Sequence, residues 1–150
     1  MRTYLVVMDE TREARVALRF AARRAARTGG AVQILAFVEP QEFVQWGAVQ
    51  AAMEEEAQIR VEAMVAAASG ELAEELGIRP TITVRQGEPV PSVRAHLAEH
   101  PEVAALVLAA SASGPGPLIE HFAGADVGQL PCPVMIIPGA LTDEALDRLS

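Results

Sequence analysis

The sequence predicts an α/β fold, a single doubly wound domain whose five-stranded parallel sheet carries helices on both faces. Five short apolar segments alternate with helical patterns of crossover length. The apolar segments are continuous rather than alternating, which is typical of strands covered on both faces. The chain has 150 residues, 51% of them apolar, and therefore the size and composition of one domain with a substantial core.

The five expected strands are rich in Val, Ile and Leu and are bounded by turn-forming or helical sequence. We expect them at residues 4–8, 32–38, 81–84, 103–110 and 134–137. The first helix shows an apolar face of small residues and ends at Gly29 and Gly30, as a helix with a C-terminal glycine cap does. The second is long and acidic, and we expect Gly70 to kink or split it before Gly77 ends it.

Proline positions define the third helix, which is expected to start near Pro91 and to stop at Pro101. A fourth helix is expected through Leu118, Ile119, Phe122 and Val127. Residues 1–138 then form the domain. Residues 139–150 form a short tail, which we expect to be helical and docked on the body or on another subunit.

The absence of lysine excludes several chemistries, since all twelve basic residues are arginine. A phosphate-binding P-loop and a protein kinase each need a lysine on the phosphates, and Schiff-base catalysis needs an ε-amine. No nucleophile–base pair is recognisable either, because the three histidines have no evident serine or cysteine partner. We therefore predict a binding module with no catalytic residues rather than an enzyme.

Charge and cysteine content limit the partners. The net charge of −8 argues against nucleic acid, and no apolar run is long enough for a membrane helix. The single cysteine, Cys132, permits no internal disulfide and no cysteine-based metal cluster, so we expect a reducing, cytoplasmic location. The spacing His96-x-x-Glu99-His100 resembles a zinc motif, but Pro101 follows it at once and no third ligand is evident. We predict no metal site.

The first helix carries a stripe of arginines at every third or fourth position: Arg12, Arg15, Arg19, Arg23 and Arg27. Such a stripe meets either an acidic partner or anionic ligand, or acidic side chains on a neighbouring element of the same chain.

Ligands of open α/β sheets bind beyond the carboxyl ends of the strands, where the strand order reverses. Polar and glycine-rich residues follow the first and fourth expected strands. The candidate nucleotide-binding residues are Asp9, Glu10, Thr11, Ala110, Ser111, Ser113, Gly114 and Gly116.

Each of these two segments also has a purely structural interpretation. Asp9 is placed to accept hydrogen bonds from a ribose or a base amine, but Asp9 or Thr11 is equally placed to cap the following helix. Two hydroxyls and two glycines ahead of a helix favour phosphate, whereas Pro115 and Pro117 each remove a donor and favour a plain turn.

Four segments in the same order resemble the universal stress protein (UspA) family. They are Tyr-Leu-Val-Val-Met-Asp-Glu-Thr at 4–11, Gln-Gly-Glu-Pro at 86–89, Val-Leu-Ala-Ala-Ser at 107–111 and Leu-Pro-Cys-Pro-Val-Met-Ile-Ile at 130–137. The resemblance covers nearly the whole chain. It implies a Rossmann-like sheet of the adenine-nucleotide-hydrolase type with the first strand beside the fourth. It also implies a homodimer formed by antiparallel pairing of the fifth strands, from Val134 to Ile137.

Many members of that family bind ATP through a G-x2-G-x9-G-[ST] loop after the fourth strand and an aspartate after the first. Asp9 matches the aspartate. The loop is degenerate: alanine or serine replaces its first two glycines, and Glu120-His121 falls where the closing Gly-[Ser/Thr] belongs. A carboxylate there would repel phosphates.

The resemblance therefore implies a cytoplasmic stress-response or signalling protein with a candidate site for ATP or another adenine nucleotide. The main alternative is a dimeric protein-interaction module, with protein partners that remain unidentified, that binds no ATP. A slow nucleotide hydrolase is the other, weaker alternative.

Overall fold

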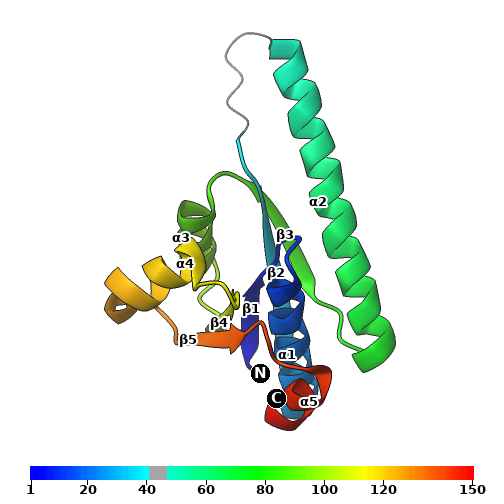
Figure 1. Ribbon diagram of the computed structural model, residues 1–150, viewed down its shortest axis with the longest axis vertical. Helices are drawn as coiled ribbons and strands as arrows, with labels where there is room; N and C mark the ends of the chain where they lie inside the picture. The colour runs from blue at the N-terminus through cyan, green and yellow to red at the C-terminus, as the bar shows by residue number, and fades with distance from the viewer. Residues whose placement is uncertain (41–46) are drawn as a thin grey trace.

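One five-stranded parallel sheet forms the centre of the computed structural model, which describes residues 1–40 and 47–150 (Figure 1). The strands are β1 (Thr3–Val7), β2 (Ala31–Val38), β3 (Thr81–Gln86), β4 (Val103–Ala110) and β5 (Val134–Pro138). Their order across the sheet is β3-β2-β1-β4-β5, so β1 lies in the middle with β4 beside it. The predicted fold class and all five predicted strands are confirmed.

Helices cover both faces of the sheet, which explains the continuous apolarity of its strands (Figure 1). The helices are α1 (Arg12–Thr28), α2 (Gly47–Leu76), α3 (Pro89–Glu99), α4 (Gly116–Glu120) and α5 (Asp143–Leu149). Along β1, Tyr4 and Val6 pack in the core formed with α1 and α2, whereas Leu5 and Val7 pack in the core formed with α3 and α4. Within the described residues, no helix combines the length and the apolarity needed to cross a membrane.

The long helix α2 is continuous, and the expectation that Gly70 would kink or split it is wrong. A glycine inside a helix costs only about 1 kcal/mol relative to alanine. Val65 and Leu72, on either side of Gly70, are buried in the core and hold the helix in place. The first turns of α2 project beyond the carboxyl edge of the sheet (Figure 1).

The fourth predicted helix is only partly regular. After α4 the chain forms a π-helical turn at His121–Ala125 and a 3-10 turn at Val127–Gln129. The amide of Asp126 donates to the carbonyl of His121 (3.2 Å), which closes the wide turn, and the Asp126 carboxylate pairs with Arg94 of α3. This tertiary contact ends the regular helix, and helical periodicity in the sequence does not reveal it.

Helix α5 packs on α1 through Leu146, which is fully buried. The Thr142 hydroxyl caps the helix by accepting from the amide of Ala145 (3.2 Å). An apolar anchor and a cap together hold residues of the tail against the domain.

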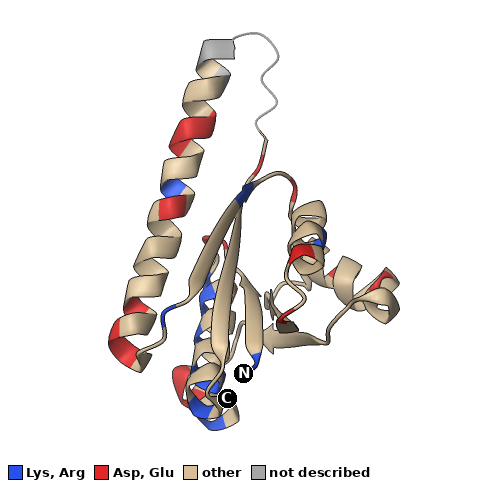
Figure 2. Cartoon of the chain, turned by 180° about the vertical axis from the view of Figure 1, so that it is seen from behind, with Lys and Arg blue, Asp and Glu red and all other residues tan. Residues whose placement is uncertain are grey.

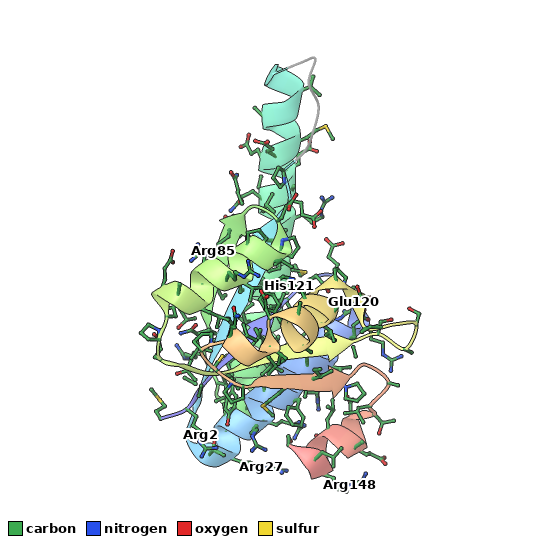
Figure 3. All side chains as sticks on the ribbon, turned by 90° about the vertical axis from the view of Figure 1, so that its left-hand side faces the viewer. Arg2, Arg27, Arg85, Glu120, His121 and Arg148 are labelled. Carbon is green, nitrogen blue, oxygen red and sulfur yellow. The ribbon has the colours of Figure 1, made fainter. Side chains whose placement is uncertain are left out.

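The arginine stripe of α1 meets acids of its own chain (Figure 2). Arg19 pairs with Glu75 of α2 (3.3 Å), and Arg23 pairs with Asp147 of α5 (2.7 Å). Arg27, labelled beside α5 in Figure 3, donates to the carbonyl oxygen of Asp147 (2.6 Å). These contacts support the interpretation of the stripe as a structural face that holds α2 and α5.

Candidate functional site

The carboxyl ends of β1 and β4 lie side by side at the point where the strand order reverses. The two strands are paired in register, with Val6 opposite Val107. The chain leaves β1 toward β2 on one side and returns through α3 to β4 on the other. This is the position where open α/β sheets bind ligands.

A cavity of about 590 Å³ opens at this position. Its volume lies within the range of small-molecule sites. It is lined by the end of β1, the start of α1, the end of β2, the projecting part of α2, and the end of β4 with the loop that follows. The lining residues are Val7, Met8, Asp9, Glu10, Thr11, Glu13, Ala14, Phe37, Val38, Glu39, Ala57, Arg60, Val61, Met64, Pro89, Leu108, Ala109, Ser111, Gly114, Pro115, Gly116, Pro117 and Leu118.

One side of the cavity is apolar and the other is polar. Phe37 and Val38 of β2 and Val61 and Met64 of α2 form the apolar side. Asp9 and its neighbours after β1 supply carboxylates and a hydroxyl on the polar side. Such a site suits a flat, largely apolar ring that carries a few hydrogen-bonding groups.

The turn after β1 resolves the two interpretations of Asp9 and Thr11. Thr11 is the helix cap, because its hydroxyl accepts from the amide of Ala14 (3.3 Å). Asp9 is exposed, and its carboxylate accepts from both the amide (2.9 Å) and the hydroxyl of Thr11. A carboxylate has about four acceptor positions, so Asp9 retains capacity for a ligand.

The loop after β4 is closed by its own hydrogen bonds. The Ser111 carbonyl accepts from the amide of Gly114 (3.2 Å), and the Ser111 hydroxyl accepts from the amide of Ser113 (3.2 Å). Pro115 and Pro117 have no amide hydrogen. Four of the seven residues from 111 to 117 therefore offer no free amide to an anion, and the geometry favours a structural turn over a phosphate cradle.

Glycine is needed in this loop for backbone conformation. Gly114 has φ 149° and Gly116 has φ 81°, values that residues with a side chain rarely adopt. The glycines shape the turn that forms one edge of the cavity.

The structure brings most of the candidate residues together. Those that line the cavity are Asp9, Glu10, Thr11, Ser111, Gly114 and Gly116. Ala110 and Ser113 do not line it. Leu108 and Ala109 of β4 line the cavity instead, and the Ala110 carbonyl accepts from the amide of Gly139 (2.7 Å). The Ser113 hydroxyl is bonded to that of Ser111 (2.9 Å).

Sequence reasoning missed Arg60, which reaches the cavity from α2. Its Nε lies 3.5 Å from the Glu10 carboxylate. Among the lining residues that the structure describes, Arg60 is accompanied by four acidic residues: Asp9, Glu10, Glu13 and Glu39. Arg60 is the only basic residue of α2, a signal present in the sequence, but its distance from Asp9 along the chain concealed the contact.

Glu120 and His121 are not among the lining residues; both belong to the short helical segment after the loop (Figure 3). The lining therefore includes no carboxylate from Glu120, and the repulsion of phosphates by this residue stays a prediction. His121 Nε2 lies 2.8 Å from the Asp126 carboxylate. The hydrogen bond from Arg94 holds the pKa of Asp126 below its usual value, so this cluster fastens the segment to α3.

The His96-x-x-Glu99-His100 spacing forms a structural network. His96 is buried and donates from Nε2 to the Gln33 side-chain oxygen (2.8 Å), while Glu99 pairs with Arg85. Burial, with the charges of His100 and Arg85, lowers the pKa of His96 to about 4. In the part of the chain that the structure describes, no three His, Cys, Asp or Glu residues are grouped to hold a metal ion.

Known structures with this fold include several universal stress proteins. UspA from Lactobacillus plantarum aligns with a TM-score of 0.73 at 19% identity, covering 91% of this chain and 97% of that chain. A universal stress protein from Archaeoglobus fulgidus in complex with dAMP aligns with a TM-score of 0.60 at 18% identity, covering 91% and 97%. One in complex with cAMP aligns with a TM-score of 0.58 at 18% identity, covering 91% and 96%.

Identities this low show a shared fold and nothing finer. No curated protein matches the chain. The family assignment comes from the sequence itself, because the universal stress protein family matches residues 1–138. That match spans all five strands and the residues that line the cavity at the carboxyl ends of β1 and β4. The chain therefore belongs to the universal stress protein family.

Proposed function

We propose that this universal stress protein acts in stress response or signalling by binding an adenine nucleotide in the cavity at the carboxyl ends of β1 and β4. The observation that carries the proposal is the cavity itself, about 590 Å³ in volume, with Asp9 at one side and an apolar wall at the other. Two structures of the same fold were determined with cAMP and with dAMP. Isothermal titration calorimetry with adenosine, AMP and ATP tests the proposal directly.

Binding rather than turnover fits the chemistry of the lining. Thr11 and Ser111 provide hydroxyls, but none of the three histidines lines the cavity. The Thr11 hydroxyl donates to Asp9 and is held as the cap of α1, and the Ser111 hydroxyl is bonded to Ser113 of its own loop. A slow hydrolase remains the weaker alternative, and phosphate release above background from purified protein would reveal it.

We infer a cytoplasmic location, because the single cysteine, Cys132, is half-buried and unpaired.

Replacing Asp9 with alanine should abolish nucleotide binding, because the carboxylate is the best-placed acceptor for ribose or adenine donors. For the wild type, nucleotide at a hundredfold excess over Kd should stabilise the fold by about 2.7 kcal/mol in a thermal or chemical unfolding experiment. The D9A variant should show no such gain. Glu144→Ala, which removes an exposed acid in the first turn of α5, is the matched control and should respond as the wild type does. An unchanged response in D9A would mean that the nucleotide binds elsewhere.

A member that binds no nucleotide and acts only as an interaction module is the second candidate. The four carboxylates of the lining and the closed loop after β4 favour it, since both weaken the attraction for phosphate. The same titrations decide between the two. No heat and no stabilisation with adenosine, AMP or ATP at millimolar concentration would refute nucleotide binding and favour the interaction module.

We propose in addition that the protein forms a homodimer through β5. This strand is at the edge of the sheet, where its outer backbone groups have no partner strand within the described chain. Val134, Met135, Ile136 and Ile137 make it apolar, and Ile136 is 43% exposed. Exposed apolar residues on an unpaired edge strand favour pairing with a second copy.

Replacing Ile136 with lysine should convert such a dimer to a monomer, because a charge on an edge strand opposes strand pairing. Sedimentation equilibrium at micromolar concentration would measure the change. Val127→Lys, also at an exposed apolar position but outside the sheet, is the control and should stay dimeric. A wild-type protein that sediments as a monomer would refute the proposed dimer.

A further inference from the structure

We propose that Arg60 is the phosphate-binding residue of this cavity and that the site therefore selects an adenine nucleotide with a single phosphate group. The inference rests on the proposed function and adds to it a residue and a ligand class. It depends on three observations: the position of Arg60, the closed loop after β4, and the charge of the lining.

Arg60 is the only basic residue that lines the cavity within the described part of the chain. Its one ion pair, with Glu10, is long at 3.5 Å, and both side chains are 66% exposed. Exposed ion pairs of this kind contribute little to stability and exchange partners readily. A phosphate entering the cavity can therefore replace Glu10 as the partner of Arg60 without disturbing the fold.

The loop after β4 cannot take that role alone. Two of its amides already donate to Ser111, and Pro115 and Pro117 have none to donate. A phosphate bound here needs another donor. The planar guanidinium of arginine donates two parallel hydrogen bonds to phosphate, which makes Arg60 the best donor available on the lining.

The charge of the lining limits how many phosphates the site accepts. Four carboxylates face the cavity against the single guanidinium of Arg60. Arg60 compensates the first phosphate. Each further phosphate adds negative charge near carboxylates with no additional cation to offset it, so affinity should not increase from AMP to ATP.

Calorimetric titration of the wild type and four variants with adenosine, AMP and ATP tests the inference, at fixed ionic strength and without divalent cations. Wild-type protein should bind AMP roughly tenfold more tightly than adenosine, which is the usual gain from a charge-assisted contact. ATP should bind no more tightly than AMP. In Arg60→Gln the AMP preference should fall to about one, and Arg60→Lys should retain part of it because lysine keeps the charge but loses the fork.

Arg79→Gln is the matched control. Arg79 is also exposed, but it precedes β3 at the opposite end of the sheet and does not line the cavity. This variant should keep the wild-type preference for AMP. If Arg60→Gln also kept it, the phosphate would be bound by another group and the inference would be wrong.

Glu10→Gln gives an independent check with the opposite sign. The change neutralises the Glu10 carboxylate, which competes with phosphate for Arg60 and also repels it. The preference for AMP over adenosine should therefore increase severalfold. A decrease would overturn the assignment of Arg60.

The titrations also separate this inference from the proposed function. Adenosine binding without any preference for AMP would leave the nucleoside site intact and refute the role of Arg60. Absence of binding by all three compounds would refute both.

Discussion

Replacing Phe122 with alanine should lower the free energy of unfolding by about 3–5 kcal/mol, the usual cost of removing a buried aromatic side chain. Phe122 lies in the π-helical turn after α4 and is completely buried. It belongs to the core between the sheet and helices α3 and α4, which also contains Leu108 of β4. The loss reflects both the apolar area exposed and the cavity left behind.

Urea denaturation measures this change, and Val127→Ala is the control. Val127 follows the π-helical turn but is 48% exposed, so its truncation should change stability by no more than about 0.5 kcal/mol. Because Phe122 anchors the segment that follows the cavity loop, F122A should also weaken nucleotide binding. A loss of stability in F122A as small as that in the control would mean that this segment is not docked on the sheet.

Lowering the pH from 7 to 4 should cost about 3 kcal/mol of stability through His96 alone. His96 is 1% exposed, its Nε2 donates to Gln33, and its Nδ1 has no hydrogen-bond partner in the described structure. Burial is the main cause that lowers its pKa from 6.5 to about 4, and the nearby charges of His100 and Arg85 add to it. A proton on the buried ring has no acceptor to stabilise it.

The sign of the effect follows from the order of the two pKa values. Between pH 6.5 and pH 4 the unfolded chain binds a proton at His96 and the folded chain does not. Falling pH therefore favours unfolding over this range. The contribution is complete above 6.5, declines toward 4 and is lost below it.

His96→Gln should remove most of this pH dependence, because glutamine does not titrate and keeps a donor for Gln33. His121→Gln is the matched control, because His121 lies on another element, is only partly buried and pairs with Asp126 rather than with His96. Chemical denaturation at pH 7, 5.5 and 4.5 gives the slopes. Equal slopes for the wild type and H96Q would show that His96 is not buried in its neutral form.

The order of elements could be predicted from local sequence because each has a local cause. Unbroken runs of Val, Ile and Leu produce the buried strands, and Thr11 and Gly29 delimit α1 through a cap hydroxyl and a left-handed backbone. The errors came where tertiary contacts outweigh local tendency. Gly70 does not break α2, because core contacts on either side keep the helix intact, and the Arg94–Asp126 pair shortens the fourth helix.

The candidate site was predictable in part for the same reason. Asp9, Thr11 and Ser111 follow strand ends, and parallel strands bring their carboxyl ends to one edge of the sheet. Arg60 was not predictable, because only the packing of α2 over the sheet brings it to Glu10. Which face of the sheet Ala109 and Ala110 each point to depends on strand register. Hydrophobicity alone does not specify that register when both faces are buried.

Amino-acid order thus determines, through apolar patterning, caps and glycines, that this chain folds as a doubly wound sheet with a polar strand tip at Asp9. Composition also determines that any phosphate contact from a permanently charged basic side chain comes from arginine, because the chain contains no lysine. The tertiary structure decides which arginine lines the cavity. The hydrogen bonds that close the loop after β4 are local, within residues 111–114, whereas the packing of α2 that places Arg60 beside Glu10 joins segments far apart in the chain, where local rules carry no information.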